Sequence, residues 1–229
     1  MEADLQSIFT QMYNDAEIIE EYSQIANNEA IGGGYAAHDL SHVNRVINNC
    51  GRIAKYLDMN SEDITTIKIA ALLHDIGCVS GGKSGHDKRS AEWAKKYLQN
   101  KGMSKNACAK IITAISEHSD NAQSAYGKIL LFFDKIDISE KRILPAGLLI
   151  VGNRQYGRTK SVEFSIESSA LNVNFISNGQ IDIAEMNEYY FTKKVFKGIA
   201  GLASHFGLGH RIAVDGEDVL KTATALSWE

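Results

Sequence analysis

The chain has 229 residues, of which 44% are hydrophobic and 23% are charged, and its formal net charge is -4 with a pI of about 6.0. This length and hydrophobic content are enough for a sizeable core in one domain. The slight acidity argues against the basic surface that binding to duplex nucleic acid usually requires, so we expect no specific nucleic-acid partner. Small phosphorylated ligands stay compatible with the charge.

Hydrophobic residues recur at helical spacing through most of the first 136 residues. Ser61 is expected to cap a helix that leads to His74 and is stopped by Gly77. The glycine-rich and serine-rich segment from 78 to 85 predicts a mobile loop. The predicted helices cover residues 3–28 (one or two helices), 40–57, 61–77, 87–100, 104–118 and 128–136.

The pattern changes after Gly157, where apolar and polar residues alternate through 162–166, 171–175 and, after a slip, 181–183. Residues 177–179 have turn chemistry, which favours a small antiparallel β-hairpin or meander near 160–183. A long helix from about 184 to 206 is expected next. The tail from 208 to 229 contains glycines and allows a last helix over 216–226. The predicted fold class is therefore mainly α with a small β insertion.

The three cysteines, Cys50, Cys78 and Cys108, form no CxxC pair, and each falls in or beside an apolar helical pattern. This distribution suits reduced, buried thiols in a cytosolic protein. The acidic start of the chain lacks the features of a signal peptide, and no run of about 18 apolar residues occurs. We therefore expect a soluble cytoplasmic protein with no membrane partner.

Side chains of the kinds that bind metal ions lie on or at the ends of the predicted helices. A shared metal site needs neutral imidazoles and carboxylates that converge from different helices, with apolar neighbours around them. Asp134 directly follows the apolar run 129–133, where burying a charge is costly unless a cation compensates it. The candidate ligands are His42, His74, Asp75, His86, His118 and Asp134.

The order His42, His74-Asp75 and Asp134 resembles the HD superfamily of metal-dependent phosphohydrolases over roughly residues 35–145. Residues 42–46 resemble its first histidine motif, residues 70–77 its second, and residues 129–142 its last-aspartate motif. The resemblance implies an HD-type helical bundle as a metal-binding domain over 1–157. A β insertion over 158–183 would follow, and then a helix and tail over 184–229 that pack on the same domain.

The resemblance also implies a ligand set. His42, His74, Asp75 and Asp134 would hold a first metal, and Asp75 would bridge to a second one bound by His86 and His118. Asp75, His86 and His118 are then the catalytic candidates. A ligand set of nitrogen and oxygen without thiolate favours Mn, Fe, Co, Ni or Mg as one or two divalent metal ions.

Further details bear on the number of metals. Residues 114–118, ending in His118, are similar to the AI-x-x-H motif of the dinucleoside polyphosphate hydrolase branch. Ser119 stands where cyclic-dinucleotide members have a second histidine, and the loop before His86 is unusually rich in glycine. A one-metal site, in which His86 and His118 line the phosphate pocket, therefore stays open beside the two-metal site.

Basic residues near these motifs are candidates for phosphate contacts, with solvated side chains as the alternative for each. They are Arg45, Lys83, Lys88 and Lys135, with Arg89 and Arg142 as further candidates. His38, one helical turn before His42, could share the site, but a role as an exposed partner or as a support of a ligand is favoured. Asp137, three residues after Asp134, is expected to orient a histidine rather than bind metal. The β insertion would either cap the site or form a homodimer contact.

These observations predict a metal-dependent phosphohydrolase that cleaves a phosphoester or phosphoanhydride of a nucleotide or another small phosphorylated molecule. One alternative is a non-catalytic module of the same fold that senses a nucleotide or a metal. A less favoured alternative is a di-iron oxygenase that uses the same ligand set.

Overall fold

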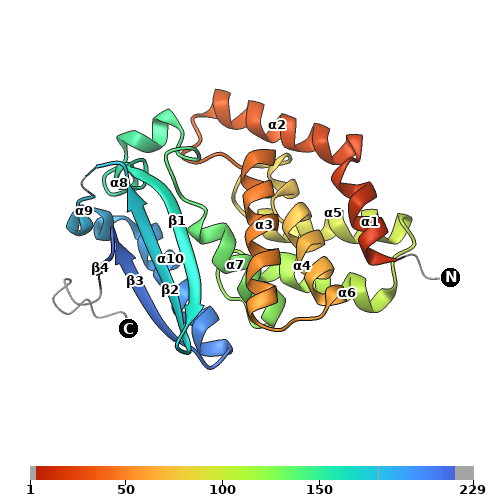
Figure 1. The fold of residues 1–229 in the computed structure, drawn as a ribbon. Helices are drawn as coiled ribbons and strands as arrows, with labels where there is room; N and C mark the ends of the chain where they lie inside the picture. Colours follow the sequence, from red (N-terminus) through yellow and green to blue (C-terminus); the bar gives the residue numbers. More distant parts are fainter. Residues whose placement is uncertain (1–3, 180, 220–229) are drawn as a thin grey trace. The chain divides into compact units, whose positions relative to one another are not determined.

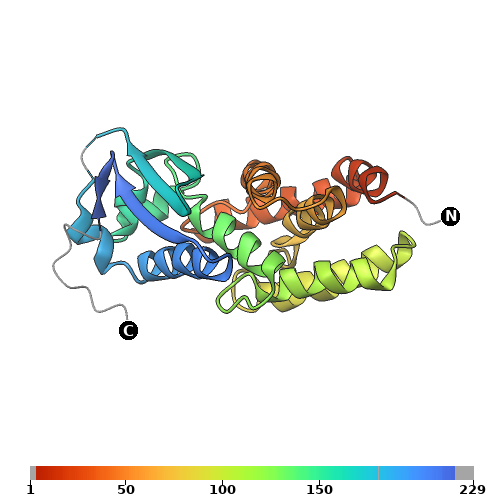
Figure 2. The same ribbon diagram turned by 60° about the horizontal axis from the view of Figure 1, so that its bottom comes forward.

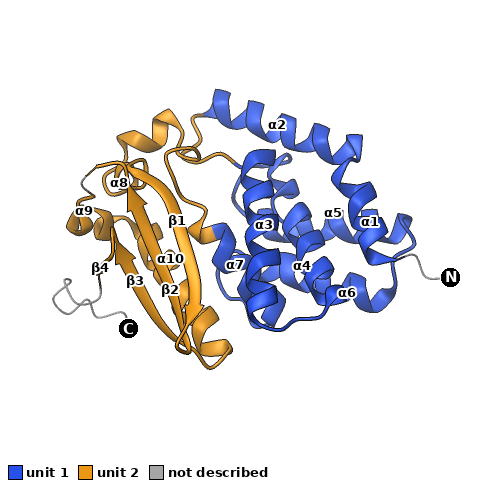
Figure 3. Ribbon diagram, viewed as in Figure 1, with its two compact units in different colours: residues 1–32, 38–134 blue, residues 33–37, 135–229 orange. Residues whose placement is uncertain are grey.

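The computed structural model describes residues 4–179 and 181–219. It confirms a mainly helical fold with a small sheet in the C-terminal half of the chain (Figure 1). The chain divides into two compact units, and each is described by itself (Figure 3). Unit 1 contains the residues up to Gly32 together with His38–Asp134, and unit 2 contains Gly33–Ala37 and the residues from Lys135 onward.

Unit 1 is helical. Its elements are α1 (Leu5–Tyr13), α2 (Ala16–Gly32), α3 (Leu40–Tyr56), α4 (Ser61–Leu73), the 3-10 helix η1 (Ile76–Cys78), α5 (His86–Asn100), α6 (Lys105–Glu117) and most of α7 (Ala125–Ile136). Side-chain caps fix several starts, since Asp39 accepts a bond from the His42 N–H and Ser104 accepts one from the Ala107 N–H. Helix α3 packs on α4, and α5 and α6 lie side by side in both views (Figures 1 and 2).

Two details around α4 differ from the sequence prediction. Asn60, not Ser61, caps the helix, because the Asn60 side chain accepts the bond from the Asp63 N–H. The helix ends at Leu73, and Gly77 lies in η1 instead of stopping the helix. A Cβ atom at Gly77 would lie 2.4 Å from the Ser90 backbone nitrogen, so glycine is required here by the close approach of α5.

Unit 2 contains a four-stranded sheet in the order β1-β2-β3-β4. Its elements are the 3-10 helix η2 (Pro145–Leu149), α8 (Asn153–Tyr156), β1 (Thr159–Glu167), β2 (Ala170–Ser177), α9 (Ile183–Glu188), α10 (Tyr190–His205), β3 (Gly209–Val214) and β4 (Glu217–Asp218). Strands β1 and β2 pair antiparallel, β2 and β3 parallel, and β3 and β4 antiparallel. Helix α10 contacts β2 and β3 and covers one face of the sheet (Figure 2).

The predicted hairpin is confirmed, but its turn and its continuation are not as predicted. The turn is formed by Ser168 and Ser169, which both have positive φ, and not by residues 177–179. The Asp182 carboxylate accepts a bond from the Glu185 N–H, so Ile183 begins a helix instead of ending a strand.

The rest of unit 2 also departs from the prediction. The long helix predicted over 184–206 is two helices, because Tyr189 is extended at ψ 121°. Strand β3 stands where a tail was expected. Residues 216–218 form a turn and β4, so the helix predicted over 216–226 does not begin there, and from residue 220 it lies outside the described residues.

The division into domains at residues 157 and 183 stays a prediction. Along the chain, the boundary between the two compact units falls between Asp134 and Lys135, within α7. Over residues 4–179 and 181–219, every helix is too short or too polar to cross a membrane.

Candidate metal centre

The six candidate ligands come from five places in unit 1. His42 lies in the first turns of α3, His74 and Asp75 directly follow α4, and His86 begins α5. His118 directly follows α6, and Asp134 lies in α7. None of the six is more than 4% exposed. The helix ends therefore bring together polar side chains that were far apart in the sequence, and bury them.

Four of these side chains form a first group, which consists of His42, His74, Asp75 and Asp134. The ligand atoms of the group all lie within 4.8 Å of one another. His42 Nε2 lies 3.3 Å from His74 Nε2 and 3.3 Å from Asp134 Oδ1. His74 Nε2 lies 3.1 Å from Asp75 Oδ2. Four potential ligand atoms from three helices or helix ends are thus close enough to bind one ion, which is what a chelating site requires.

Asp75, His86 and His118 form a second group on the other side of the Asp75 carboxylate. Asp75 Oδ1 lies 3.1 Å from His86 Nε2 and 3.7 Å from His118 Nε2. The two imidazoles are 2.9 Å apart at their Nε2 atoms. One oxygen of Asp75 thus faces the first group and the other oxygen faces the second, as a bridging carboxylate would.

Backbone carbonyls hold three of the rings. The Nδ1 atom of His74 pairs with the Ala71 carbonyl at 2.7 Å, and that of His118 pairs with the Ile115 carbonyl at 2.6 Å. The Nδ1 atom of His86 pairs with the Lys83 carbonyl at 2.8 Å. A carbonyl only accepts, so each Nδ1 carries the proton and each Nε2 presents a lone pair to the cluster when the ring is neutral.

The two buried carboxylates dominate the electrostatics. Burial by itself lowers the pKa of His74, but the charges of Asp75 and Asp134 outweigh it and raise that pKa to about 9. Burial likewise raises the pKa of Asp75, but the neighbouring His74 charge holds it well below its usual range. His118 behaves differently, because burial lowers its pKa to about 4.

The donor set fits a divalent metal ion. Asp75 Oδ2 is buried, and with His74 neutral it has no hydrogen-bond donor among residues 4–179 and 181–219, which is costly for a carboxylate oxygen in the interior. It faces His42 Nε2 at 3.4 Å and His74 Nε2 at 3.1 Å, so an ion between these atoms would satisfy it. The three cysteines are buried free thiols, as expected, and none belongs to either group.

The other predicted site residues of unit 1 lie at different distances from the cluster. Lys83 Nζ lies 3.2 Å from Asp75 Oδ1, and its side chain is 46% exposed. Lys88 is exposed and Arg45 is half-buried. His38 pairs through Nδ1 with the Glu29 carboxylate, and its ring stands edge-on to that of His42, with 5.9 Å between centroids. Among the proposed phosphate contacts, Lys83 thus pairs directly with a candidate ligand, Asp75.

Three of the predicted residues belong to unit 2. Lys135 is buried, and its Nζ lies 5.9 Å from the centroid of the Phe191 ring. Arg142 donates from Nε to the Ala37 carbonyl and from Nη1 to the Asp137 carbonyl. The proposed roles of Lys135 and Arg142 at phosphate, and of Asp137 beside a histidine, stay predictions.

The sequence did not indicate two residues of α2 that bond to segments next to the candidate ligands. Glu29, in α2, holds His38 by its ring and by its backbone N–H. Tyr22, also in α2, is buried and donates its hydroxyl hydrogen to the Leu72 carbonyl at 2.7 Å, two residues before His74. Both contacts join segments that are distant or lie across a loop, so no local periodicity could have indicated them.

Part of the chain is similar to known proteins. Residues 39–145 match the model of the HD domain family, and this range contains all six candidate ligands. The chain is also similar to a crystal structure of a predicted HD superfamily hydrolase from an uncultured Thermotogales bacterium. The identity is 28%, the similarity covers 60% of this chain and 75% of that chain, and the TM-score is 0.45. No curated protein matches the chain. The match therefore assigns residues 39–145, the segment that contains the candidate metal centre, to the HD-domain superfamily.

Proposed function

We propose that the protein is a metal-dependent phosphohydrolase that cleaves a phosphoester or phosphoanhydride of a small phosphorylated molecule, with a nucleotide as the favoured substrate. The observation that carries the proposal is the position of Asp75, which belongs to both buried groups and turns one oxygen to each. A shared carboxylate of this kind suits paired metal ions, as used in in-line displacement at phosphorus.

In this proposal His42, His74, Asp75 and Asp134 would hold one divalent metal, and Asp75, His86 and His118 would hold another. Divalent metals supply Lewis acidity, which makes hydroxide available near neutral pH and offsets the charge that develops on phosphoryl oxygens. The protein's own part is orientation. The carbonyls of Ala71, Lys83 and Ile115 fix three imidazole rings, and the near-complete burial of the ligands keeps competing water away from them.

Lys83 is the favoured phosphate contact. Its ammonium group lies beside Asp75 while its side chain is half exposed, so it can donate to a phosphoryl oxygen that enters from solvent. We expect Lys83→Ala to raise KM for the phosphorylated substrate. An unchanged KM would remove Lys83 from the substrate pocket. Arg45 and Lys88 are weaker candidates, because only their partial or full exposure supports such a role.

The test is hydrolysis by the purified protein supplied with Mn²⁺, Co²⁺ or Ni²⁺, on an aryl phosphate and on a panel of nucleotides. The double variant His74→Ala, Asp75→Ala should abolish turnover, whereas His205→Ala, an exposed histidine of α10, should leave it unchanged. Persistence of turnover in the double variant would contradict the site assignment. A nucleotide that raises Tm without being hydrolysed would favour the sensing module. Bound iron with a mixed-valent EPR signal and no phosphatase activity would favour the oxygenase.

A further inference from the structure

The segment 77–85, which we call the ligand loop, connects Asp75 to His86 and serves both groups of the cluster. Lys83 of this loop acts twice, since its Nζ reaches Asp75 Oδ1 and its carbonyl holds the Nδ1 of His86. Beyond η1 the loop has turns but no helix or strand, and three of its glycines have positive φ. Such a backbone needs an external support to hold Lys83 in place.

Arg89 supplies that support from the first turn of α5. Its Nε donates to the Gly77 carbonyl at 2.8 Å, Nη1 to the Ser84 carbonyl at 2.6 Å, and Nη2 to the Gly82 carbonyl at 2.5 Å. Backbone carbonyls at the start, middle and end of the ligand loop thus all accept hydrogen bonds from the Arg89 guanidinium. Arginine can do this because its guanidinium presents donors in a rigid fork.

The glycines of the loop fit around the same group. A Cβ atom at Gly81 would lie 3.5 Å from the guanidinium carbon of Arg89, and one at Gly85 would lie 3.5 Å from its Nη1. The loop therefore wraps closely around the guanidinium. Arg89 also lies three residues after His86 on the same helix, so the support and the ligand move as one body.

We propose that Arg89 is a positioning residue, whose three bonds to the ligand loop hold Lys83 and His86 in register with Asp75. The inference rests on the proposed function only in treating the cluster as the active centre. It differs from the role suggested by the sequence, in which Arg89 contacts phosphate. The two roles can be separated by experiment. A phosphate contact needs mainly the positive charge of Arg89, whereas positioning needs the several N–H donors of its planar guanidinium.

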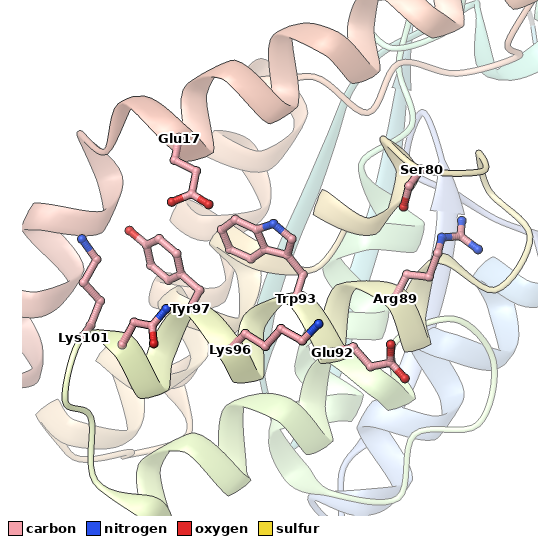
Figure 4. Close-up of a pocket in the computed structure, with 9 residues that line it drawn as sticks. Glu17, Ser80, Arg89, Glu92, Trp93, Lys96, Tyr97 and Lys101 are labelled. Atoms are coloured by element: carbon pink, nitrogen blue, oxygen red, sulfur yellow. The ribbon is translucent and has the colours of Figure 1, made fainter.

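The control comes from a cleft that Arg89 lines. This cleft, of about 610 Å³, is lined also by Ser80 of the ligand loop and by Trp93 and Lys96 of α5 (Figure 4). Lys96 lies seven residues after Arg89, hence on the same face of the helix, and makes none of the bonds to the loop. Lys96→Ala therefore removes a positive charge from the same cleft without touching the loop.

The first measurement is amide hydrogen exchange on the metal-free protein. The amides of Gly77, Cys78 and Gly82 are bonded within or beside the loop, so they report its opening. Arg89→Lys keeps the charge but loses the fork, and we expect exchange at these amides to rise at least tenfold, as in Arg89→Ala. The amides of α3 and α4 should not change, and Lys96→Ala should match the wild type. Unchanged loop exchange in both Arg89 variants would overturn the proposal.

The second measurement separates this inference from the proposed function. Titration with Mn²⁺ alone should show about a 10- to 100-fold weaker second binding event in Arg89→Lys, with the first event unchanged. In turnover, Arg89→Lys should lower kcat more than it changes KM. A raised KM with normal loop exchange would make Arg89 a phosphate contact and overturn the proposal. A wild type that binds one metal would refute the two-metal arrangement, while the exchange data would still decide the role of Arg89.

Discussion

The close approach of η1 and α5 at Gly77 makes a sharp prediction. In Gly77→Ala the added Cβ atom would lie 2.4 Å from the Ser90 nitrogen and 2.7 Å from the His86 oxygen, and both are backbone atoms that cannot rotate away. Overpacking costs about 1–3 kcal/mol, and a clash with backbone belongs at the upper end. The lower entropy of the unfolded chain with alanine returns up to about 1 kcal/mol. We therefore expect a net loss of about 2 kcal/mol.

For a chain of this size that loss corresponds to a fall in Tm of about 4–8 °C, followed by circular dichroism. The matched control is Gly32→Ala at the end of α2, where a Cβ atom would meet nothing within 4 Å, and we expect its Tm to change little. Because the clash separates the segment after Asp75 from the start of α5, Gly77→Ala should also weaken Mn²⁺ binding by the second group. A Gly77→Ala protein as stable as the wild type would refute the close approach itself.

Three further predictions follow from other contacts of unit 1. Mn²⁺ at 100 times its Kd should stabilise the protein by about 2.7 kcal/mol, and Asp75→Asn should remove most of this gain in Tm; equal gains in both would place the metal elsewhere. Tyr22→Phe removes the buried bond to the Leu72 carbonyl and should cost about 1 kcal/mol in urea unfolding, whereas no loss would mean that the bond contributes nothing. Hydrogen bonds from Tyr97 and then Lys101 lower the pKa of Asp15 to about 2. Its contribution to stability is therefore complete above pH 3.8 and is lost as the pH falls toward 2, so stability should depend less on pH in Asp15→Asn over that range, and an unchanged dependence would contradict the assignment.

The sequence was sufficient for the helices of unit 1 because the signals there are local. The apolar face of α3 repeats at helical spacing, and its boundaries were predicted to within a residue. Asp134 stood out because a charge follows an apolar run, and the structure places that residue, 2% exposed, beside His42. The clustering of candidate ligands at the ends of amphipathic helices can thus be predicted from the sequence, since the buried face fixes where each helix end points.

Several features that the sequence did not predict depend on contacts that leave no periodic pattern in it. Strand β3 has no alternating pattern and is held by parallel pairing to β2, which lies across α9 and α10 in the chain. The role of Arg89 is set by three backbone carbonyls, and carbonyls carry no signature in a sequence. Gly77 looked like a helix stop because that is the commonest use of glycine after an apolar run.

The early end of α4 explains how two adjacent side chains can face one cluster of candidate ligands. Neighbouring residues of a continuous helix point about 100° apart and do not face a common point. Here the helix ends at Leu73, and Asp75 takes φ -105° and ψ 1°, which turns the chain and brings Asp75 Oδ2 to 3.1 Å from His74 Nε2. The turn leads directly into η1, which can pack against α5 only because residue 77 has no side chain. The His-Asp pair and Gly77 therefore act together, because the glycine permits the turn that lets both side chains face the same point.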